Sequence, residues 1–195
     1  MDKRLIELRK AAADSGNPVL REKSLEILLK TIRKAAPVKI LEIGVNLGLT
    51  SVAMLSEVAG ATLTGIEIDE EKMARAEENF RTFNVKDRAK IFLGDAGEIL
   101  PLLTGEYDFI FLDGPKGHYH EYLPDVLRIL SVGGTLFADN VLFRGYVSGE
   151  VKTPHRFMTA KHSLEKFIKG ITRNPNLKTE IIDVEDGISI TEKLR

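Results

Sequence analysis

Short apolar runs alternate along this chain with longer segments in which apolar residues recur every three or four positions. The runs are typical of buried strands, and the spaced segments are typical of amphipathic helices. From residue 39 onward the two kinds of segment alternate regularly. The predicted strands are residues 39–43, 62–67, 89–93, 109–112, 134–138, 179–184 and 188–191, and the predicted helices are residues 50–57, 70–83, 97–103, 118–130 and 157–172.

This alternation predicts an α/β fold built on a doubly wound sheet. Strands separated by helices pair in parallel through right-handed crossovers. The last two predicted strands flank Asp186-Gly187 and are too close in sequence for a crossover, so they should pair as a hairpin. We therefore expect about seven strands, mostly parallel, with one antiparallel strand.

Two helical segments, residues 2–13 and 24–35, precede the first predicted strand and have no strand of their own. Pro37 ends the second segment, because proline disfavours helix at the residue before it. We expect these helices to cap the ligand-binding edge of the sheet or to form part of a dimer surface. A length of 195 residues suits one domain, in which residues 1–38 hold these helices and residues 39–195 form the core.

The composition excludes several classes of protein. The chain has no cysteine, so disulfides, thiolate metal sites and a cysteine nucleophile are impossible. No apolar run has the length of a signal peptide or a membrane span, and we expect a cytoplasmic protein without a membrane partner. The net charge is −1, but residues 144–178 contain eight Lys/Arg and two Asp/Glu. This basic segment fits either an anionic partner or a solvated helix face.

Two acids follow apolar runs, at the points where predicted strands leave the sheet. Asp113 follows the run 109–112, and Asp139 and Asn140 follow the run 134–138. Ligands of open α/β sheets bind at this edge, where two carboxylates and an amide oxygen would suit Mg²⁺ or Ca²⁺. Either acid alone could equally cap a helix or anchor a loop.

A glycine-containing turn follows the first predicted strand. Gly44 and Gly48 would let a ligand approach the backbone closely, although an ordinary strand–helix turn could also carry them. The dinucleotide-binding fingerprint requires glycine where this chain has Asn46 and Leu49. The turn therefore indicates a nucleotide-like cofactor other than NAD.

Acids at the next two strand ends refine this prediction. Glu67 ends the second strand about twenty residues on, where a carboxylate can hold both hydroxyls of a ribose. Asp95 and Ala96 follow the third strand, where they could meet the amino group of an adenine. Sugar, adenine and amino group without phosphates fit S-adenosylmethionine better than NAD.

The runs LEIGVNLGLTS, GIEID, GDA, FIFLDGPKGHY and FADNVLFRGYV together resemble the class I metal-dependent O-methyltransferases, which include catechol and caffeoyl-CoA O-methyltransferases. The resemblance covers residues 39–192 and implies a Rossmann-like methyltransferase sheet. It implies S-adenosylmethionine, Mg²⁺ (or Mn²⁺ or Ca²⁺), the general base Lys116 and the metal ligands Asp113, Asp139 and Asn140. The cofactor-binding residues expected from the motifs are Glu42, Gly44, Gly48, Thr50, Glu67, Asp95, Ala96 and Asp113.

Within that family the chain looks most like the bacterial tRNA 5-hydroxyuridine methyltransferases, through residues 140–145 and Asp186-Gly187. This resemblance implies a hydroxylated uridine in tRNA as acceptor and a homodimer. A small catechol-like acceptor is the alternative, because both substrates present two adjacent oxygens. A non-catalytic module that binds S-adenosylmethionine or RNA is a further alternative. At position 114 this chain has glycine where the catechol enzymes have histidine, which argues against that branch of the family.

Other residues have two interpretations each. His118 and His120 resemble a metal pair, but side chains at a helix start diverge and we expect them to face solvent. Phe143 and Tyr146 fit either stacking on a flat acceptor or a packed loop. The basic side chains His155, Arg156, Lys161 and Lys166 could guide RNA phosphates or cover a solvated helix.

Overall fold

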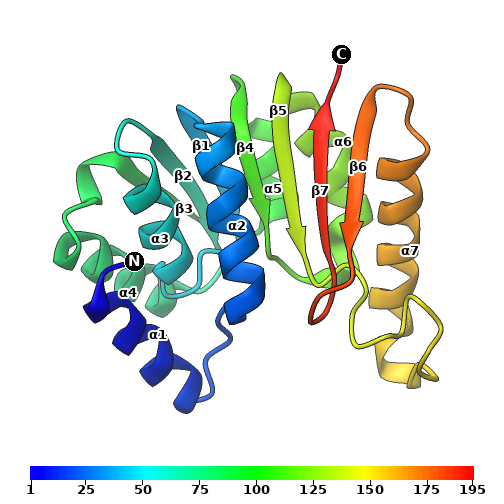
Figure 1. Ribbon diagram of the computed structural model, residues 1–195, viewed down its shortest axis with the longest axis horizontal. Helices are drawn as coiled ribbons and strands as arrows, with labels where there is room; N and C mark the ends of the chain where they lie inside the picture. The colour runs from blue at the N-terminus through cyan, green and yellow to red at the C-terminus, as the bar shows by residue number, and fades with distance from the viewer.

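Seven strands form one sheet, in the order β3-β2-β1-β4-β5-β7-β6 (Figure 1). The computed structural model describes residues 1–195. The strands are β1 (Lys39–Ile43), β2 (Thr62–Glu67), β3 (Ala89–Leu93), β4 (Tyr107–Leu112), β5 (Leu130–Asp139), β6 (Leu177–Ile182) and β7 (Ile188–Lys193).

Strands β1 to β5 are parallel, whereas β7 runs antiparallel to both of its neighbours, β5 and β6. The expected doubly wound α/β sheet with one antiparallel strand is therefore confirmed. The strand order reverses between β1 and β4, which lie side by side at the centre of the sheet. A crevice outside the carboxyl ends of such strands is the usual place for a ligand.

Helices cover both faces of the sheet (Figure 1). Helices α1 to α4 share one apolar cluster with side chains of β1, β2, β4 and β5, and helices α5 to α7 share a second cluster on the other face. No helix is long and apolar enough to cross a membrane. The helices are α1 (Lys3–Asp14), α2 (Glu22–Ala35), α3 (Leu49–Glu57), α4 (Glu70–Thr82), α5 (Ala96–Ile99), α6 (Tyr119–Ile129) and α7 (Met158–Thr172).

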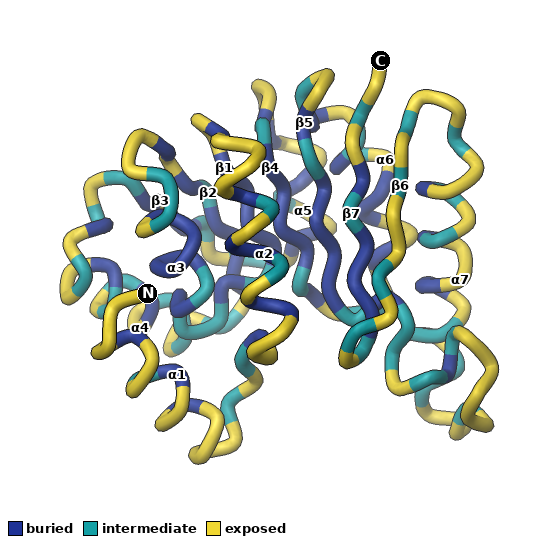
Figure 2. The backbone as a smooth tube through the Cα atoms, viewed as in Figure 1, coloured by how far each residue is buried: buried dark blue, intermediate teal, exposed yellow.

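The central strands are buried on both sides, as the dark segments of Figure 2 show. Along β4, Phe109 and Phe111 join the cluster under α2, while Ile110 and Leu112 join the cluster under α6. This alternation follows from the two-residue period of a strand. Strands covered on both faces are apolar throughout, which is why the run 109–112 shows no polar alternation.

The two N-terminal helices take different positions. The buried face of α2 packs against β4 and β5, so α2 covers a face of the sheet and not its edge as expected. Helix α1 lies beside α3 near the carboxyl ends of the strands, which is one of the two locations that the sequence analysis expected. Residues 15–21 connect the two helices. This segment is hydrogen-bonded to the turn after β1, where Asn46 Nδ2 donates to the carbonyl of Pro18 at 2.6 Å.

Two element boundaries differ from those expected. Strand β5 begins at Leu130, four residues earlier than predicted, because α6 ends at Ile129 and the chain turns extended at once. The helix predicted over 97–103 is shorter, since α5 ends at Ile99 and a 3₁₀ turn, Leu100–Leu102, follows. Pro101 has no N–H to continue the helical hydrogen bonds.

Candidate functional site

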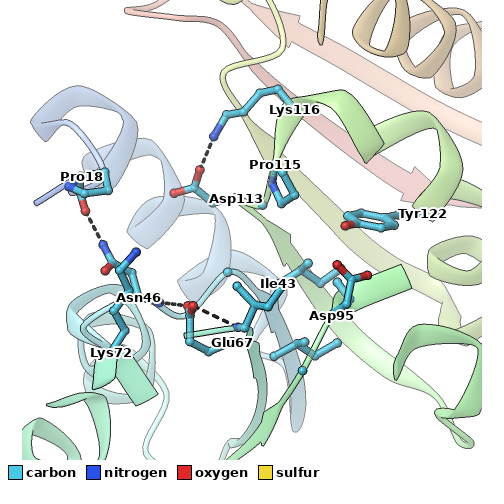
Figure 3. A pocket seen from close by; sticks show the side chains of 16 residues that line it. Pro18, Ile43, Asn46, Glu67, Lys72, Asp95, Asp113, Pro115, Lys116 and Tyr122 are labelled. Atoms are coloured by element: carbon cyan, nitrogen blue, oxygen red, sulfur yellow. Dashed lines mark hydrogen bonds and ion pairs between the residues drawn. The ribbon is translucent and has the colours of Figure 1, made fainter. Parts of the chain in front are cut away.

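A cavity of about 240 Å³ opens at the carboxyl ends of β1 to β4 (Figure 3). Most of its walls come from the turns that follow these strands, and Pro18, in the segment between α1 and α2, also lines it. Six of the candidate residues line it together: Gly44, Glu67, Asp95, Ala96, Asp113 and Lys116. Glu42, Gly48, Thr50, Asp139 and Asn140 do not line this cavity.

Gly44 is required where the turn after β1 meets the end of β4. Its φ is +92°, and a Cβ at this position would lie 2.4 Å from the carbonyl oxygen of Asp113. Only glycine allows this close approach of two backbones. The two strand ends are also joined by a hydrogen bond of 3.0 Å from the Asp113 N–H to the Ile43 carbonyl.

Gly48 has a packing role in addition to the cofactor-binding role predicted for it. It stands before α3 with a φ of +69°, and its missing Cβ would lie 2.7 Å from Phe80 and 2.9 Å from the Cβ of Ala76. Both neighbours belong to α4. Gly48 therefore permits close packing of α3 on α4, because a Cβ at this position would point into the apolar core.

The carboxylate of Glu67 is held in one orientation at the end of β2. It accepts hydrogen bonds from the N–H groups of Asn46 at 2.6 Å and of Ile68 and Asp69 at 3.0 Å each. Figure 3 shows the carboxylate at the floor of the cavity. Each carboxylate oxygen can accept further hydrogen bonds, so Glu67 can receive hydroxyl donors from a ligand.

Asp95 begins α5 at the opposite side of the cavity. Its Oδ1 accepts the Gly97 N–H at 2.7 Å, which leaves Oδ2 for a ligand. Tyr122 of α6 lies nearby, and burial, followed by the charges of Asp95 and Glu121, raises the pKa of its hydroxyl to about 12. The hydroxyl therefore stays protonated and can donate.

Glu42 is buried under the turn after β1, with only 1% of its surface exposed. It accepts a hydrogen bond from the Ser51 hydroxyl. Its pKa is raised to about 8, mainly by burial and in smaller part by the charges of Asp113 and Glu67, against the lowering effect of the Ser51 hydrogen bond. Glu42 is therefore mostly protonated at neutral pH and supports the turn from below.

Asp113 and Lys116 form an ion pair at the end of β4, with Nζ 2.9 Å from Oδ1 (Figure 3). Pro115 ends the extended segment, and Lys116 starts the 3₁₀ turn Lys116–His118. This turn brings the lysine back over the aspartate three residues earlier. Both side chains are partly exposed, at 22% for the lysine and 27% for the aspartate.

Asp139 lies next to Asp113, because Leu112 pairs with Ala138 in the sheet and each acid is the next residue. Asp139 is 4% exposed, and its Oδ1 is buried without a hydrogen-bond partner. Burial raises the pKa of Asp139 to about 7, and the charge of Asp113 adds to this rise while Lys116 opposes it. An orphaned buried oxygen beside a second carboxylate suits a cation ligand.

Tyr119 fixes the spacing of the two strand ends. Its hydroxyl lies 3.1 Å from both the Leu112 and the Asp139 carbonyl oxygens, between which its single proton is shared. The ring is fully buried against Phe167 of α7. The hydroxyl therefore ties β4 to β5 at Leu112, one residue before Asp113, and at Asp139 itself.

Asn140 begins a tightly folded loop after β5. Three residues of this loop have positive φ values between +41° and +59°: Asn140, Phe143 and Arg144. Residues other than glycine and asparagine rarely adopt this left-handed backbone conformation. Such strained positions are common near functional sites. No group of three or more His, Cys, Asp or Glu side chains is arranged to hold a metal, and the candidate set contains two carboxylates and one amide.

An aromatic cluster made of Phe143, Tyr146 and Phe157 closes the loop. The ring centroids lie 5.5 to 5.6 Å apart, and the guanidinium groups of Arg144 and Arg156 lie over the Phe157 ring. Tyr146 is buried, while the two phenylalanines are half-buried. The rings thus pack on one another and leave part of two faces accessible.

The two histidines diverge as expected. His118 Nδ1 lies 2.6 Å from a carboxylate oxygen of Glu121, and the ring stacks on Tyr122. His120 instead lines an open depression with Lys166 and Lys169 of α7 and with Arg173, which follows the last residue of that helix. They do not form a metal pair.

The lining residues that the sequence analysis did not assign to the site include Pro18, Ile68, Lys72 and Tyr122. Ile68 is 67% exposed directly after Glu67, and an apolar residue beside a strand-end acid could have been a signal. Tyr122 and Pro18 come from other elements and reach the cavity only through tertiary packing.

Comparison with known proteins agrees with this geometry. A family model described as O-methyltransferase matches residues 4–194. The tapetum-specific methyltransferase 1 of Arabidopsis thaliana is 30% identical, over 97% of this chain and 86% of the relative. A catechol O-methyltransferase of Niastella koreensis is 29% identical, over 78% and 72% of the two chains.

A solved structure shares the whole architecture. The crystal structure of the Podospora anserina methyltransferase PaMTH1, bound to SAH, superposes with a TM-score of 0.86 at 26% identity, over 99% of this chain and 88% of that one. The cavity at the carboxyl edge and the acids at its strand ends agree with such a cofactor. The chain therefore belongs to the O-methyltransferase family and is an S-adenosylmethionine-dependent O-methyltransferase of the caffeoyl-CoA and catechol type.

Proposed function

We propose that the enzyme transfers the methyl group with the help of a divalent cation, Mg²⁺ or alternatively Mn²⁺ or Ca²⁺, held by Asp113, Asp139 and Asn140. The observation that carries this proposal is the buried, unpartnered Oδ1 of Asp139 beside the second carboxylate. Without a cation, the charge of Asp113 disfavours the ionised form of the buried Asp139. Oxygen ligands are those that Mg²⁺ and Ca²⁺ prefer.

The acceptor in this proposal carries a hydroxyl beside a second oxygen. A bound cation would lower the pKa of that hydroxyl by stabilising the oxyanion. Lys116 would act as the general base and take the hydroxyl proton on Nζ once a bound cation has replaced it as the partner of Asp113. The acceptor oxygen then forms its bond to the methyl carbon as the carbon–sulfur bond breaks, which gives a methyl ether and S-adenosylhomocysteine.

The cofactor would occupy the cavity at the carboxyl edge. We assign the ribose hydroxyls to Glu67 and the adenine to Asp95 and Ala96. The methionine part would lie against Gly44, Thr50 and Asp113. Glu42 is buried and a Cβ on Gly48 would meet α4, so we assign both residues the role of shaping the turn that holds this part.

We propose 5-hydroxyuridine in tRNA as the acceptor. The basic segment 144–178 begins at the aromatic cluster, and α7 contacts the turn that carries Lys116. Aromatic faces beside arginine suit an unstacked base, and the lysines of α7 suit a phosphate backbone. A tRNA acceptor would place the reaction in the cytoplasm, as the sequence analysis expects.

A small catechol-like acceptor is the second candidate. It is favoured by the relatives, among them the catechol O-methyltransferase of Niastella koreensis. A catechol presents the same pair of adjacent oxygens as 5-hydroxyuridine, so the proposed metal site accommodates both.

Methyl transfer assays with radiolabelled S-adenosylmethionine and Mg²⁺ would separate the two acceptors. The test acceptors are tRNA from a strain that lacks this protein and 3,4-dihydroxybenzoate. We expect methylated 5-hydroxyuridine in nucleosides from the treated tRNA, and accumulated 5-hydroxyuridine in the untreated tRNA. Transfer to the catechol alone would overturn the tRNA assignment and leave the metal site standing.

We also propose that residues 1–195 act as one domain and that two copies form a homodimer. The continuous cluster that joins α2 to β4 and β5 supports the first point. The half-exposed apolar side chains of Met1 and Ile6 on the N-terminal segment support the second. Light scattering at several concentrations would report the mass of the particle, and a monomer throughout would contradict the dimer.

A further inference from the structure

One buried charged side chain, Arg9, forms no ion pair and lies outside the groups assigned above. Burial lowers the pKa of its guanidinium, and the charge of Glu22 opposes this effect without contacting the group. Arg9 occupies the inward face of α1 between Leu5 and Ala12, and only 8% of its surface is exposed. Its Nη1 is buried with no hydrogen-bond partner. A buried, unpaired guanidinium is costly, so a ligand anion is the natural partner.

The position of Arg9 indicates which ligand group this is. Arg9 lines a small cavity of about 30 Å³ with Thr50, Gly44 and Asp113. The small cavity shares Gly44, Asp113, Pro18 and Asn46 with the main cavity, so it forms a side branch of the cofactor site. Only a small chemical group fits there.

The start of α3 faces the same side branch. The helix begins at Leu49 with no side-chain cap, and its first internal hydrogen bond runs from the Val52 N–H to the Gly48 carbonyl. The N–H groups of Leu49, Thr50 and Ser51 therefore have no partner within the helix. Leu49 and Thr50 line the side branch beside Arg9. Free N–H groups at a helix start favour an anion.

The chain segment over the side branch is also fixed by Arg9. Nη2 of Arg9 donates to the Leu20 carbonyl, and Asn46 Nδ2 donates to the Pro18 carbonyl at 2.6 Å (Figure 3). These two bonds hold residues 18–20 in place and orient the guanidinium, so Nη1 is left for another acceptor.

We propose that Arg9, together with the free N–H groups at the start of α3, binds the α-carboxylate of the methionine part of S-adenosylmethionine. Asp113 lines the same side branch with the opposite charge, so the branch matches a zwitterionic amino acid, with the ammonium toward Asp113 and the carboxylate toward Arg9. The inference rests on the use of S-adenosylmethionine and requires neither the proposed metal nor the proposed acceptor.

Calorimetric titration with two ligands tests this role. S-adenosylhomocysteine carries the α-carboxylate, whereas 5′-methylthioadenosine keeps the nucleoside and lacks the amino acid. For Arg9→Met we expect about 10- to 100-fold weaker binding of S-adenosylhomocysteine, since a hydrogen bond to a charged group is lost. Binding of 5′-methylthioadenosine should be nearly unchanged. Arg4→Met, an exposed position of the same helix that pairs with Asp2, is the matched control and should bind both ligands normally.

Equal losses for the two ligands would assign Arg9 a purely structural role and overturn the proposal, as would unchanged binding of S-adenosylhomocysteine. Should Arg9→Met fail to fold, Arg9→Lys is the second variant, because it keeps the charge on a shorter side chain. It should weaken binding of S-adenosylhomocysteine and leave binding of 5′-methylthioadenosine unchanged. In the wild type, an analogue of S-adenosylhomocysteine that lacks only the α-carboxylate should bind about 10- to 100-fold more weakly than S-adenosylhomocysteine itself. Because no metal or acceptor is present, a failed metal proposal would leave these results unaffected.

Discussion

At the scale of single residues, the strand-end acids were predictable and their protonation was not. Asp113 and Asp139 follow apolar runs, and a local pattern therefore revealed them. The raised pKa values of Glu42 and Asp139 arise from burial and from acids on other strands. Arg9 was missed for the same reason, since a single arginine in the stripe Leu5, Arg9, Ala12 reads as a break in an amphipathic helix until its surroundings are known.

Lys116 is the residue whose substitution should separate chemistry from binding. We expect Lys116→Met to lower kcat by about 10²- to 10⁴-fold, because proton transfer by a positioned side chain contributes rate enhancements of that order. Binding of S-adenosylhomocysteine should remain normal, since the proton is taken from the acceptor. Single-turnover kinetics and calorimetry measure the two effects, and an unchanged kcat would exclude Lys116 as the base.

The raised pKa of Glu42 predicts that the stability of the protein depends on pH. Its pKa is about 8 in the folded protein and 4.5 in its ordinary state, so the unfolded chain binds fewer protons between these values. The free energy of unfolding should therefore fall as pH rises from about 5 to 8, by up to about 1.4 kcal/mol per pH unit from this group. Below the unfolded pKa the contribution is fully present.

Urea denaturation of Glu42→Gln across this pH range measures that contribution. The variant cannot ionise, so its stability relative to the wild type should rise with pH. Glu26→Gln, at an exposed position of α2, should follow the wild type at every pH. Parallel curves for Glu42→Gln and the wild type would show that Glu42 is ionised in the folded protein.

At the scale of elements, the sequence located all seven strands, but tertiary contacts set their ends. The start of β5 was placed four residues late because its first residues read as the end of α6. The place of α2 could not be read from its own pattern, since an apolar helix stripe does not reveal which surface it covers. Its partners on β4 and β5 are more than seventy residues away in sequence.

The contact of α3 with α4 depends on Gly48. Gly48→Ala should lower the free energy of unfolding by about 2–4 kcal/mol, because the added Cβ meets Phe80 and Ala76 and the positive φ disfavours alanine. Gly60→Ala is the matched control, since no heavy atom lies within 4 Å of its added Cβ. Equal stability of the two variants in urea denaturation would contradict the packing role.

The tie between β4 and β5 depends on the Tyr119 hydroxyl. Tyr119→Phe removes one oxygen and leaves the Leu112 and Asp139 carbonyls without this donor. We expect a loss of about 1–3 kcal/mol in the free energy of unfolding, measured by urea denaturation. A variant as stable as the wild type would mean that other groups satisfy both carbonyls.

At the scale of the whole molecule, the structure shows where part of the positive charge of residues 144–178 lies on the surface. The sequence revealed the basic segment, but not that its side chains gather on one side. Lys166, Lys169 and Arg173 form no ion pairs and surround an open depression of about 450 Å³ with His120. A helical pattern alone could not place His120 of α6 beside them.

This basic surface predicts a salt-dependent affinity for tRNA. Lys169→Glu combined with Arg173→Glu should weaken tRNA binding and reduce the slope of log affinity against log salt concentration, because fewer counterions are released. Lys30→Glu combined with Lys34→Glu, at exposed positions of α2, makes the same change of charge elsewhere and should have a smaller effect. Filter binding over a range of salt concentrations measures tRNA affinity for both double variants. Equal losses of affinity would show that tRNA binding depends on net charge alone and not on this surface.

The cation site is the centre of the proposed reaction, and manganese binding tests it without knowledge of the acceptor. Electron paramagnetic resonance of Mn²⁺ titrated into the protein with bound S-adenosylhomocysteine counts the bound ions. We expect one Mn²⁺ per chain in the wild type and in Asp183→Ala, a control at an exposed carboxylate, and none in Asp139→Ala at the same concentrations. One Mn²⁺ bound with equal affinity in Asp139→Ala, or no bound Mn²⁺ in the wild type, would contradict the proposed mechanism.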